Sequence, residues 1–389
     1  MSHTNDFAAG AHRGAASRAA PRAPHIGVLP AGPLGTIADV AGVTVGHCTL
    51  ADGALQTGVT VLRPHRGDPF VAKVPAAASV INGFGKSIGL VQLDELGTLE
   101  TPIALTNTFG VGALAQAQIR AAIRANSRIG REWSTVNPLV FECNDGYLND
   151  IQALAIGEQH FDQAFAAAGT EVASGAVGAG RGMSSFDLKG GIGTASRVVR
   201  VAGRDYMVGA LVLANFGRLP MLTIDGTPLG RLLADRAAAA GAGTPSAAAD
   251  PIADPMAHPT TGKPEQGSII MIVATDAPLD ARQLKRVSLR AAAGLARTGS
   301  VYGHGSGDIA LAFSTAYTVP YDADLVTLPP LVADHCLDPL FRACADSVEQ
   351  AIVDALWSAE SVTGRDGHRR RSLRDSVPDL AELLGLSTR

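Results

Sequence analysis

A serine stands at a position where it could become both a nucleophile and its own base. Ser268 follows Gly267 and opens the apolar run Ile269–Val273, which is typical of a buried strand. The stretch 234–266 before it is rich in Ala, Gly, Pro and Thr and is long for a loop inside a compact domain. If the peptide bond before Ser268 is cut, the new α-amine, which titrates near about 7.7–8.0, can take the proton of the adjacent hydroxyl. A flexible linker followed by an ordinary core strand is the other interpretation.

A glycine-rich turn carries a second pair of polar groups. Ser306 and Asp308 lie two residues apart, directly before the apolar run Ile309–Phe313. Residues two apart on an extended chain point to the same side. The carboxylate could then orient an amine while the hydroxyl hydrogen-bonds to it. A turn capped by Ser and Asp side chains explains the same residues without chemistry.

Further polar residues stand where strands are expected to end. Glu142 could bind a cationic substrate group, and Tyr147 could donate a hydrogen bond to a developing oxyanion. Asn215 could point an N–H at a reacting carbonyl oxygen, and Lys189, in a glycine loop, could place positive charge near a nucleophile. The alternatives are a turn with a helix cap, a structural amide and a backbone nest for phosphate.

A dinucleotide site is the main rival for the glycines. Gly110, Gly112 and Ala115 match G-x-G-x-x-A between an expected strand and an expected helix. The turn is longer than that fingerprint needs, no acidic strand end follows about 20 residues on, and 44 glycines make chance matches common. The histidines and cysteines show no ligand spacing. We therefore expect neither a metal nor an organic cofactor.

The elements that must position these residues come in clusters. Short apolar runs predict strands at 43–45, 58–62, 77–81, 103–106, 139–141, 198–201, 207–213, 269–273 and 309–313. Amphipathic patterns predict helices at 112–126, 150–168, 280–299 and 341–360. Because strands and helices do not alternate strictly, an α+β layered sandwich is favoured over a parallel doubly wound sheet.

Composition limits the remaining possibilities. The 389 residues are 46% hydrophobic, carry a net charge of −4, and show no basic stripe that would indicate nucleic acid. No apolar run reaches the ~18 residues of a membrane helix, and the N-terminus lacks a secretory core, so we expect a cytoplasmic protein that binds no membrane. Residues 1–34 are expected to be a disordered tail, and the charged segment after Arg365 to be peripheral.

These motifs together resemble the family of L-aminopeptidase/D-esterase (DmpA-like) enzymes and β-peptidyl aminopeptidases, N-terminal nucleophile type hydrolases that include nylon-oligomer hydrolases. The similarity runs from about Gly35 to Gly367, through 37–47, 57–61, 101–108, 142–150, 189–196, 267–279, 303–313 and 364–367. It implies a single αββα domain, 35–389, that cuts itself between Gly267 and Ser268. The α chain would end at 267 after a mobile linker at about 238–267, and the β chain would span 268–389. The cleaved units would form a homotetramer.

The resemblance also implies roles for seven residues, which are Ser268, Ser306, Asp308, Tyr147, Asn215, Lys189 and Glu142. In that order they match the nucleophile, two residues that orient its amine and hydroxyl, two proposed oxyanion donors, a lysine implicated in the nylon hydrolases, and a carboxylate assigned to the substrate ammonium group. The implied activity is that of a serine aminopeptidase or amidase acting through an acyl-enzyme. Its substrates would be small peptides, amides or esters of α-, β-, D- or ω-amino acids. An acyltransferase of the ornithine acetyltransferase type is the alternative, although those enzymes cleave before a threonine.

Overall fold

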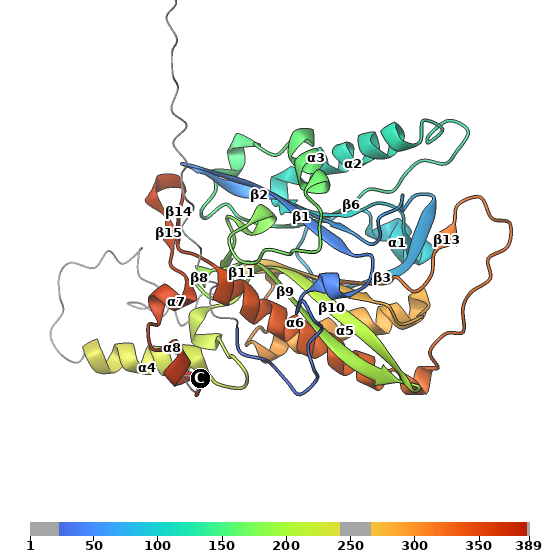
Figure 1. Ribbon diagram of the computed structural model, residues 1–389. Coiled ribbons are helices and arrows are strands. Elements are labelled where there is room, and N and C mark those ends of the chain that lie inside the picture. Colours follow the sequence, from blue (N-terminus) through green and yellow to red (C-terminus); the bar gives the residue numbers. More distant parts are fainter. Residues whose placement is uncertain (1–22, 242–265, 387–389) are drawn as a thin grey trace, which may run out of the picture.

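Two β-sheets face each other in the computed structural model, which describes residues 23–241 and 266–386 (Figure 1). The smaller sheet has the order β1 (Thr44–Asp52), β2 (Leu55–Arg63), β5 (Ile103–Asn107) and β6 (Leu139–Cys143). The larger sheet has the order β13 (Val319–Pro320), β3 (Ala72–Gly83), β12 (Gly305–Ser314), β11 (Gln266–Thr275), β10 (Arg204–Asn215) and β9 (Gly191–Val201), and β4 (Thr98–Leu99) pairs with β3. The serine strand predicted from the sequence is therefore β11, in the interior of the larger sheet.

Strand β11 contributes to two separate cores. Ile270 and Ile272 belong to the apolar cluster between the sheets, whereas Ile269, Met271 and Val273 pack in the cluster with the helices. Its apolar run is continuous because both faces are buried. Since successive side chains of a strand point to opposite faces, Ser268 lies on the face of Ile270, toward the smaller sheet.

Helices cover the outer faces of both sheets (Figure 1). Helices α5 (Ala281–Arg297) and α6 (Asp338–Ser358) pack on the larger sheet, and α2 (Val111–Ala125) and α3 (Glu158–Ala166) on the smaller one. Asp280 begins α5 by accepting the Gln283 N–H in a capping box. The other helices are α1 (Leu90–Leu96), α4 (Leu229–Gly241), α7 (Leu373–Ser376) and α8 (Leu380–Leu383). The prediction of a mixed α and β single domain is confirmed.

One predicted helix is interrupted. Instead of continuous helix over 150–168, a single turn at Ile151–Ala153 is followed by α3, which begins at Glu158. Leu154 between them has φ 48°, in the left-handed region. That conformation ends the first turn, so the prediction of one helix was wrong here. No helix within 23–241 or 266–386 has the length and apolar character needed to cross a membrane.

The N-terminal segment is attached to the domain from residue 23 onward. Ile26 is 2% exposed, its N–H donates to Gln350 Oε1 at 2.7 Å, and its carbonyl accepts from Arg197 Nη2 at 2.6 Å. Residues 23–34 of the expected tail are therefore not a free chain, because they are attached to the domain. Residues 1–22 lie outside the described residues. Of the expected linker, 238–241 belong to α4 and 266–267 to β11, and 242–265 also lie outside the described residues.

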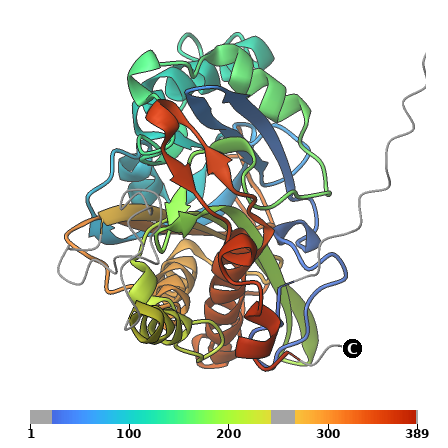
Figure 2. The same ribbon diagram turned by 90° about the vertical axis from the view of Figure 1, so that its left-hand side faces the viewer.

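The C-terminal segment is not peripheral, which corrects the expectation from its charge. Strands β14 (Val362–Thr363) and β15 (Arg369–Arg370) form a hairpin that stands beside the start of β11 (Figures 1 and 2). The following residues Leu373, Val377 and Leu380 are buried against the α5–α6 cluster. These apolar side chains hold the basic hairpin in place.

Candidate active site

Ser268 lies at the beginning of β11 between two neighbouring strands. It pairs with Asn215 of antiparallel β10 and with Gly307 of parallel β12. The Gly307 N–H donates to Ser268 Oγ at 3.2 Å, and the residue is only 6% exposed. Residues 266 and 267 continue the pairing with β12, so the peptide bond before Ser268 lies within the sheet.

Gly267 occupies a position that only glycine fits. Its φ is +133°, and a Cβ there would collide with the Asn215 carbonyl oxygen and come within 2.9 Å of Phe216 Cα. L-residues rarely adopt this φ. The peptide bond before Ser268 therefore joins a glycine in an uncommon conformation to a buried hydroxyl.

The predicted pair on β12 is in contact. Ser306 Oγ donates to Asp308 Oδ1 at 2.6 Å, and both residues are completely buried. Ser306 pairs with Gly267, so the two side chains lie one strand away from the predicted scission. The pairing of β12 with β3 shifts register between Asp308 and Ile309, a bulge that turns the Asp308 end of the strand.

The amide of Asn215 has a fixed orientation. Its Oδ1 accepts the Ser184 N–H at 2.8 Å, and its Nδ2 donates to the Asn144 carbonyl at 3.0 Å. Because an amide nitrogen carries two N–H groups, one remains for another acceptor. The residue lies opposite Ser268 in the register, as expected for a donor to a carbonyl attacked by the serine.

Lys189 is near the site, but its ammonium group is held by backbone rather than aimed at Ser268. Its Nζ donates to the carbonyls of Gly180, Met183 and Gly190 at 2.7–2.8 Å, and the side chain is completely buried. Burial lowers its pKa well below the usual value, and the Arg181 charge lowers it further. Three carbonyl acceptors match the three donors of the protonated form.

A single peptide group links Lys189 to Asn215. The Met183 carbonyl accepts from Lys189, and the N–H of the next residue, Ser184, donates to Asn215 Oδ1. The sequence indicated the lysine but not this peptide unit. The lysine therefore acts on the site through the backbone that orients the amide.

Tyr147 is held by the C-terminal hairpin, which the sequence analysis missed. Its ring stacks on His368 at 4.7 Å between centroids, and the Arg370 guanidinium lies 3.7 Å from its centroid. His368 Nδ1 bonds to the Tyr147 carbonyl at 2.9 Å, and Arg370 Nε donates to Ser184 Oγ at 3.2 Å. The only sequence feature that could have indicated this contact is the group of basic residues that follows the matched motif 364–367. Within the described residues, no group of the protein hydrogen-bonds the Tyr147 hydroxyl.

Glu142 is almost completely buried with both oxygens oriented. Oε1 accepts the Lys86 N–H at 2.8 Å, and Oε2 accepts from the Thr108 hydroxyl. An ideal Cβ on Gly85 would be 3.6 Å from Oε1 and 3.7 Å from Gly307 Cα. Gly85 thus lies between the carboxylate and the strand that donates to Ser268.

Asp145 is a further buried acid in the loop that carries Tyr147. Asn149 Nδ2 donates to it at 3.0 Å. Burial raises its pKa to about 6, and hydrogen bonds from Thr57, Asn149 and Asn107 offset part of that effect. The sequence had suggested only a turn for this residue.

The glycines of the dinucleotide match have a structural explanation. Asn107 Oδ1 accepts the Gly110 N–H at 2.9 Å and caps the turn before α2. A Cβ on Gly110 would be 2.8 Å from Thr106 Oγ1, so close packing requires the glycine. These contacts give Gly110 a role in packing and capping.

Ser268, Asn215, Ser306 and Asp308 lie on three adjacent strands of the larger sheet at the start of β11, and the other three predicted residues are connected to them through Gly85, Ser184 and the C-terminal hairpin. A hydroxyl, an oriented amide, a hydroxyl–carboxylate pair and a buried carboxylate are the groups that an amide hydrolase needs. Such a set can attack a carbonyl, stabilise the oxyanion and recognise a cation.

Comparison with known proteins agrees with this chemistry. Residues 35–370 match the profile of Peptidase family S58, and the chain belongs to this family. The chain is 39% identical over 371 residues to the beta-peptidyl aminopeptidase BapA of Sphingosinicella microcystinivorans. The alignment covers 91% of this chain and 90% of that protein.

Two solved structures share the fold. The PH0078 protein from Pyrococcus horikoshii OT3 has a TM-score of 0.82 at 43% identity, over 94% of this chain and 98% of that one. The L-aminopeptidase D-Ala-esterase/amidase from Ochrobactrum anthropi has a TM-score of 0.80 at 33% identity, over 93% of this chain and 97% of that one. It is described as a prototype for the serine aminopeptidases and a new variant of the Ntn hydrolase fold. The predicted family, and an enzyme that acts on peptide or amide bonds as an aminopeptidase, are confirmed.

Proposed function

We propose that this chain is a self-cleaving serine aminopeptidase organised as an αββα sandwich, with an α chain of residues 1–267 and a β chain of residues 268–389. The observation that carries the proposal is the placement of Ser268. Its hydroxyl accepts the Gly307 N–H at the start of a buried strand, and residues 266 and 267 continue that strand directly before it. Because Ser268 is only 6% exposed and its nitrogen is held in a peptide bond, it could use its own amine as a base only after the chain before it is cut.

The proposed maturation step uses the groups around Gly267. Ser268 Oγ attacks the Gly267 carbonyl, the C–N bond breaks, and the acyl group moves to oxygen as an ester. Water then hydrolyses the ester, which frees the Gly267 carboxylate and the Ser268 α-amine.

The mature enzyme would use the new amine as its base. The amine takes the hydroxyl proton, Oγ attacks the carbonyl of the substrate's N-terminal residue, and the amine returns the proton to the leaving group. Water then resolves the acyl-enzyme. The free N–H of Asn215 and the Tyr147 hydroxyl would stabilise the oxyanion, and Ser306 with Asp308 would orient the amine.

Glu142 is the proposed partner of the substrate ammonium group. Its carboxylate is held rigidly by two donors and is separated from the β12 backbone at Gly307 by Gly85. A buried carboxylate with fixed oxygens suits a single cation. The substrates would be peptides, amides or esters with a free amino terminus, including β-amino acid derivatives of the kind named for BapA.

We also propose a cytoplasmic homotetramer of cleaved units that needs no cofactor. Exposed apolar residues on one side, Val80, Val91, Leu96 and Leu289, support an association surface. Four free cysteines support a reducing compartment. Sedimentation of the purified protein would measure its assembly.

Intact-mass spectrometry tests the scission. The wild-type protein should give two chains of 267 and 122 residues, and Ser268→Ala a single chain without activity. Ser127→Ala removes an exposed hydroxyl and should be cleaved normally. A wild-type protein that is active as one uncut chain would overturn the proposal.

Substrate analogues test the ammonium site. Aminoacyl p-nitroanilides with a free amine should be hydrolysed, and their N-acetyl derivatives should not. Glu142→Gln should raise KM for the free amine by at least about tenfold, since a charged hydrogen bond contributes roughly 1.5–3 kcal/mol. Equal rates for free and acetylated substrates would remove Glu142 from this role.

A further inference from the structure

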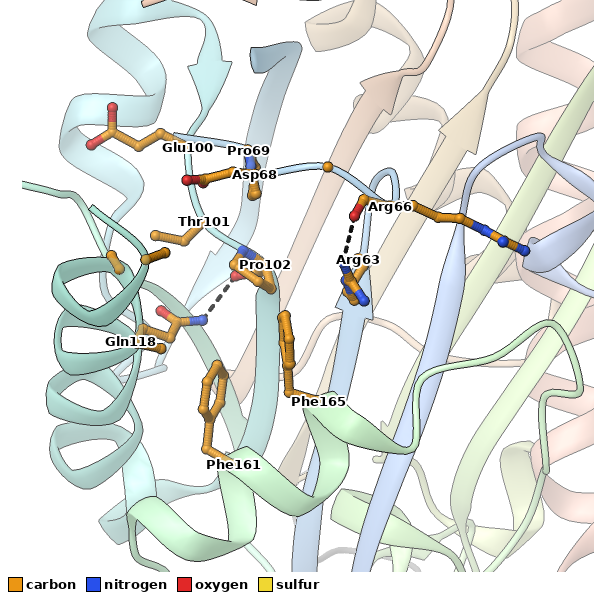
Figure 3. A pocket seen from close by; sticks show the side chains of 14 residues that line it. Arg63, Arg66, Asp68, Pro69, Glu100, Thr101, Pro102, Gln118, Phe161 and Phe165 are labelled. Atoms are coloured by element: carbon orange, nitrogen blue, oxygen red, sulfur yellow. Dashed lines mark hydrogen bonds between the residues drawn. The ribbon is translucent and has the colours of Figure 1, made fainter. Parts of the chain in front are cut away.

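A pocket lies on the outer face of the smaller sheet, away from Ser268. Its volume is about 310 Å³, and it is bounded by α2, α3, the loop after β2 and the residues before β5 (Figure 3). Its wall is largely apolar, formed by Phe161, Phe165, Pro102, Ala121 and Ala122. This size is at the lower end of the range for small-molecule sites.

Arg63 brings a positive charge to this apolar wall. Its guanidinium lies 4.5 Å from the centroid of the Phe165 ring, and Nη2 donates to the Arg66 carbonyl at 2.8 Å. Within residues 23–241 and 266–386, no carboxylate lies within 4.0 Å of its nitrogens. Burial and the Arg66 charge lower its pKa, as expected for a cation that lacks a counter-ion.

The acidic residues of the pocket are already engaged. Glu100 lies 3.3 Å from Lys73 Nζ and accepts the Asn137 N–H at 2.7 Å. Asp68 accepts the Phe70 N–H at 2.9 Å and a hydrogen bond from the Asn126 amide. Both carboxylates therefore have other partners in the chain, and within the described residues neither lies within 4.0 Å of an Arg63 nitrogen.

We propose that this pocket binds a small monocarboxylate with an apolar or aromatic body. The carboxylate would accept hydrogen bonds from Arg63, which still has unused donors, and the body would pack against Phe161 and the alanines of α2. The Arg63 guanidinium favours a carboxylate over a cation, and the apolar wall favours a ligand with an apolar body over a purely polar anion. The site is independent of the proposed cleavage at Ser268.

Titration calorimetry with three probes of one shape tests the ligand class. We expect saturable binding of one 3-phenylpropanoate per chain, at least about tenfold weaker binding of 3-phenylpropan-1-ol, and no binding of 3-phenylpropylamine. The acid should bind Ser268→Ala as it binds the wild type, which separates this pocket from the active site. Equal binding of acid and amine would overturn the proposal.

Variants locate the binding. Arg63→Gln should weaken binding of the acid by about tenfold or more, and Arg63→Lys should retain part of it. Arg66→Gln is the matched control, because it removes an equal charge from the loop directly after β2, where the guanidinium points away from the pocket (Figure 3). Ala125→Phe, at an exposed position of the lining, should block entry.

Two results would exclude the site. One is unchanged acid affinity in Arg63→Gln, with thermal unfolding showing that the variant is folded. The other is a change in sedimentation of Ala125→Phe without any change in acid binding, which would make this face a contact between copies of the chain.

Discussion

The two sides of the smaller sheet each have a cation, and the surroundings of the two cations differ. On the inner side Lys189 donates all three ammonium protons to backbone carbonyls. On the outer side Arg63 makes one hydrogen bond to a carbonyl and stacks on Phe165, at the wall of a pocket. All the ammonium donors of Lys189 have partners in the protein, whereas among the described residues most of the guanidinium donors of Arg63 have none.

In the roles that we propose, Lys189 positions a catalytic group and Arg63 binds a ligand. Lys189 fixes the peptide between Met183 and Ser184, and that peptide fixes Asn215. Catalytic donors gain from such fixed geometry because no reorganisation is needed during reaction. A binding cation must instead keep donors unused until the ligand arrives. The following predictions test whether the inner side is as rigid as this comparison requires.

Loss of the Asn215 donor should give the largest effect. Asn215→Ala should lower kcat by about 10²–10³, the loss typical of one oxyanion donor. Asn215→Asp keeps the oxygen that Ser184 binds but removes the N–H groups, so it should be similarly impaired. Steady-state kinetics on self-cleaved protein measures both, and an active Asp variant would show that the amide only positions the chain.

The pH dependence of stability probes the turn beneath Lys189. His47 bonds to Thr60, whose Oγ1 accepts the Ala179 N–H next to Gly180. Burial lowers the His47 pKa from 6.5 to about 4, and the backbone at Ala173 offsets a smaller part. Below pH 6.5 the unfolded chain binds the proton more readily, so this group costs stability as pH falls, by about 2–3 kcal/mol at pH 4.5.

Comparison with a variant isolates this effect. Asp145 acts in the opposite direction, because its raised pKa of about 6 means that stability is lost as pH rises from 3.8 through 6. The free energy of unfolding, measured with urea, should fall between pH 7.5 and pH 4.5 by about 2–3 kcal/mol more in the wild type than in His47→Gln. The same substitution at exposed His335 should leave the difference unchanged.

Local patterns predicted the strands of this fold and part of the site. The apolar run after Ser268 and the spacing of Ser306 and Asp308 depend only on alternation along a strand, and the structure reproduces both. Asn215 ends the neighbouring strand, so its approach to Ser268 follows from antiparallel pairing. Such features need information from one or two adjacent segments.

Contacts between distant segments were not predictable in the same way. The bond from Arg370 to Ser184 joins residues 186 positions apart, and that from His368 to Tyr147 spans 221 positions. The charge of the C-terminal segment indicated an exposed tail, because its few apolar anchors such as Leu373 show no periodic pattern long enough to stand out. The partners of Lys189 are backbone carbonyls, which leave no signature in residue type.

The hairpin contact gives a smaller predicted effect than Asn215. Arg370→Met should lower kcat by about tenfold with little change in KM, because a cation over an aromatic ring contributes on the order of 0.5–2 kcal/mol and here also holds Ser184. Arg370→Lys should recover part of the rate. Arg369→Met changes the exposed neighbouring arginine and serves as control. If Arg370→Met lowers the stability of the protein but does not selectively lower kcat, Arg370 contributes only to packing.

The smallest effect is expected from one added methyl group at Gly85, between Glu142 and the β12 backbone. An ideal Cβ on Gly85 would be 3.6–3.7 Å from Glu142 Oε1, Ile309 Cδ1 and Gly307 Cα, which is ordinary van der Waals contact, so Gly85→Ala should fold normally. If the substrate's amino-terminal residue passes between Glu142 and β12, the methyl should raise KM several-fold, as an added methylene in a pocket contributes roughly 1–3 kcal/mol at most. The change should fall most heavily on substrates with a longer backbone between amine and carbonyl. Acid binding at the Arg63 pocket, measured in the same variant, should remain at the wild-type value, because that pocket lies at the opposite end of β5 from Thr108 and Glu142.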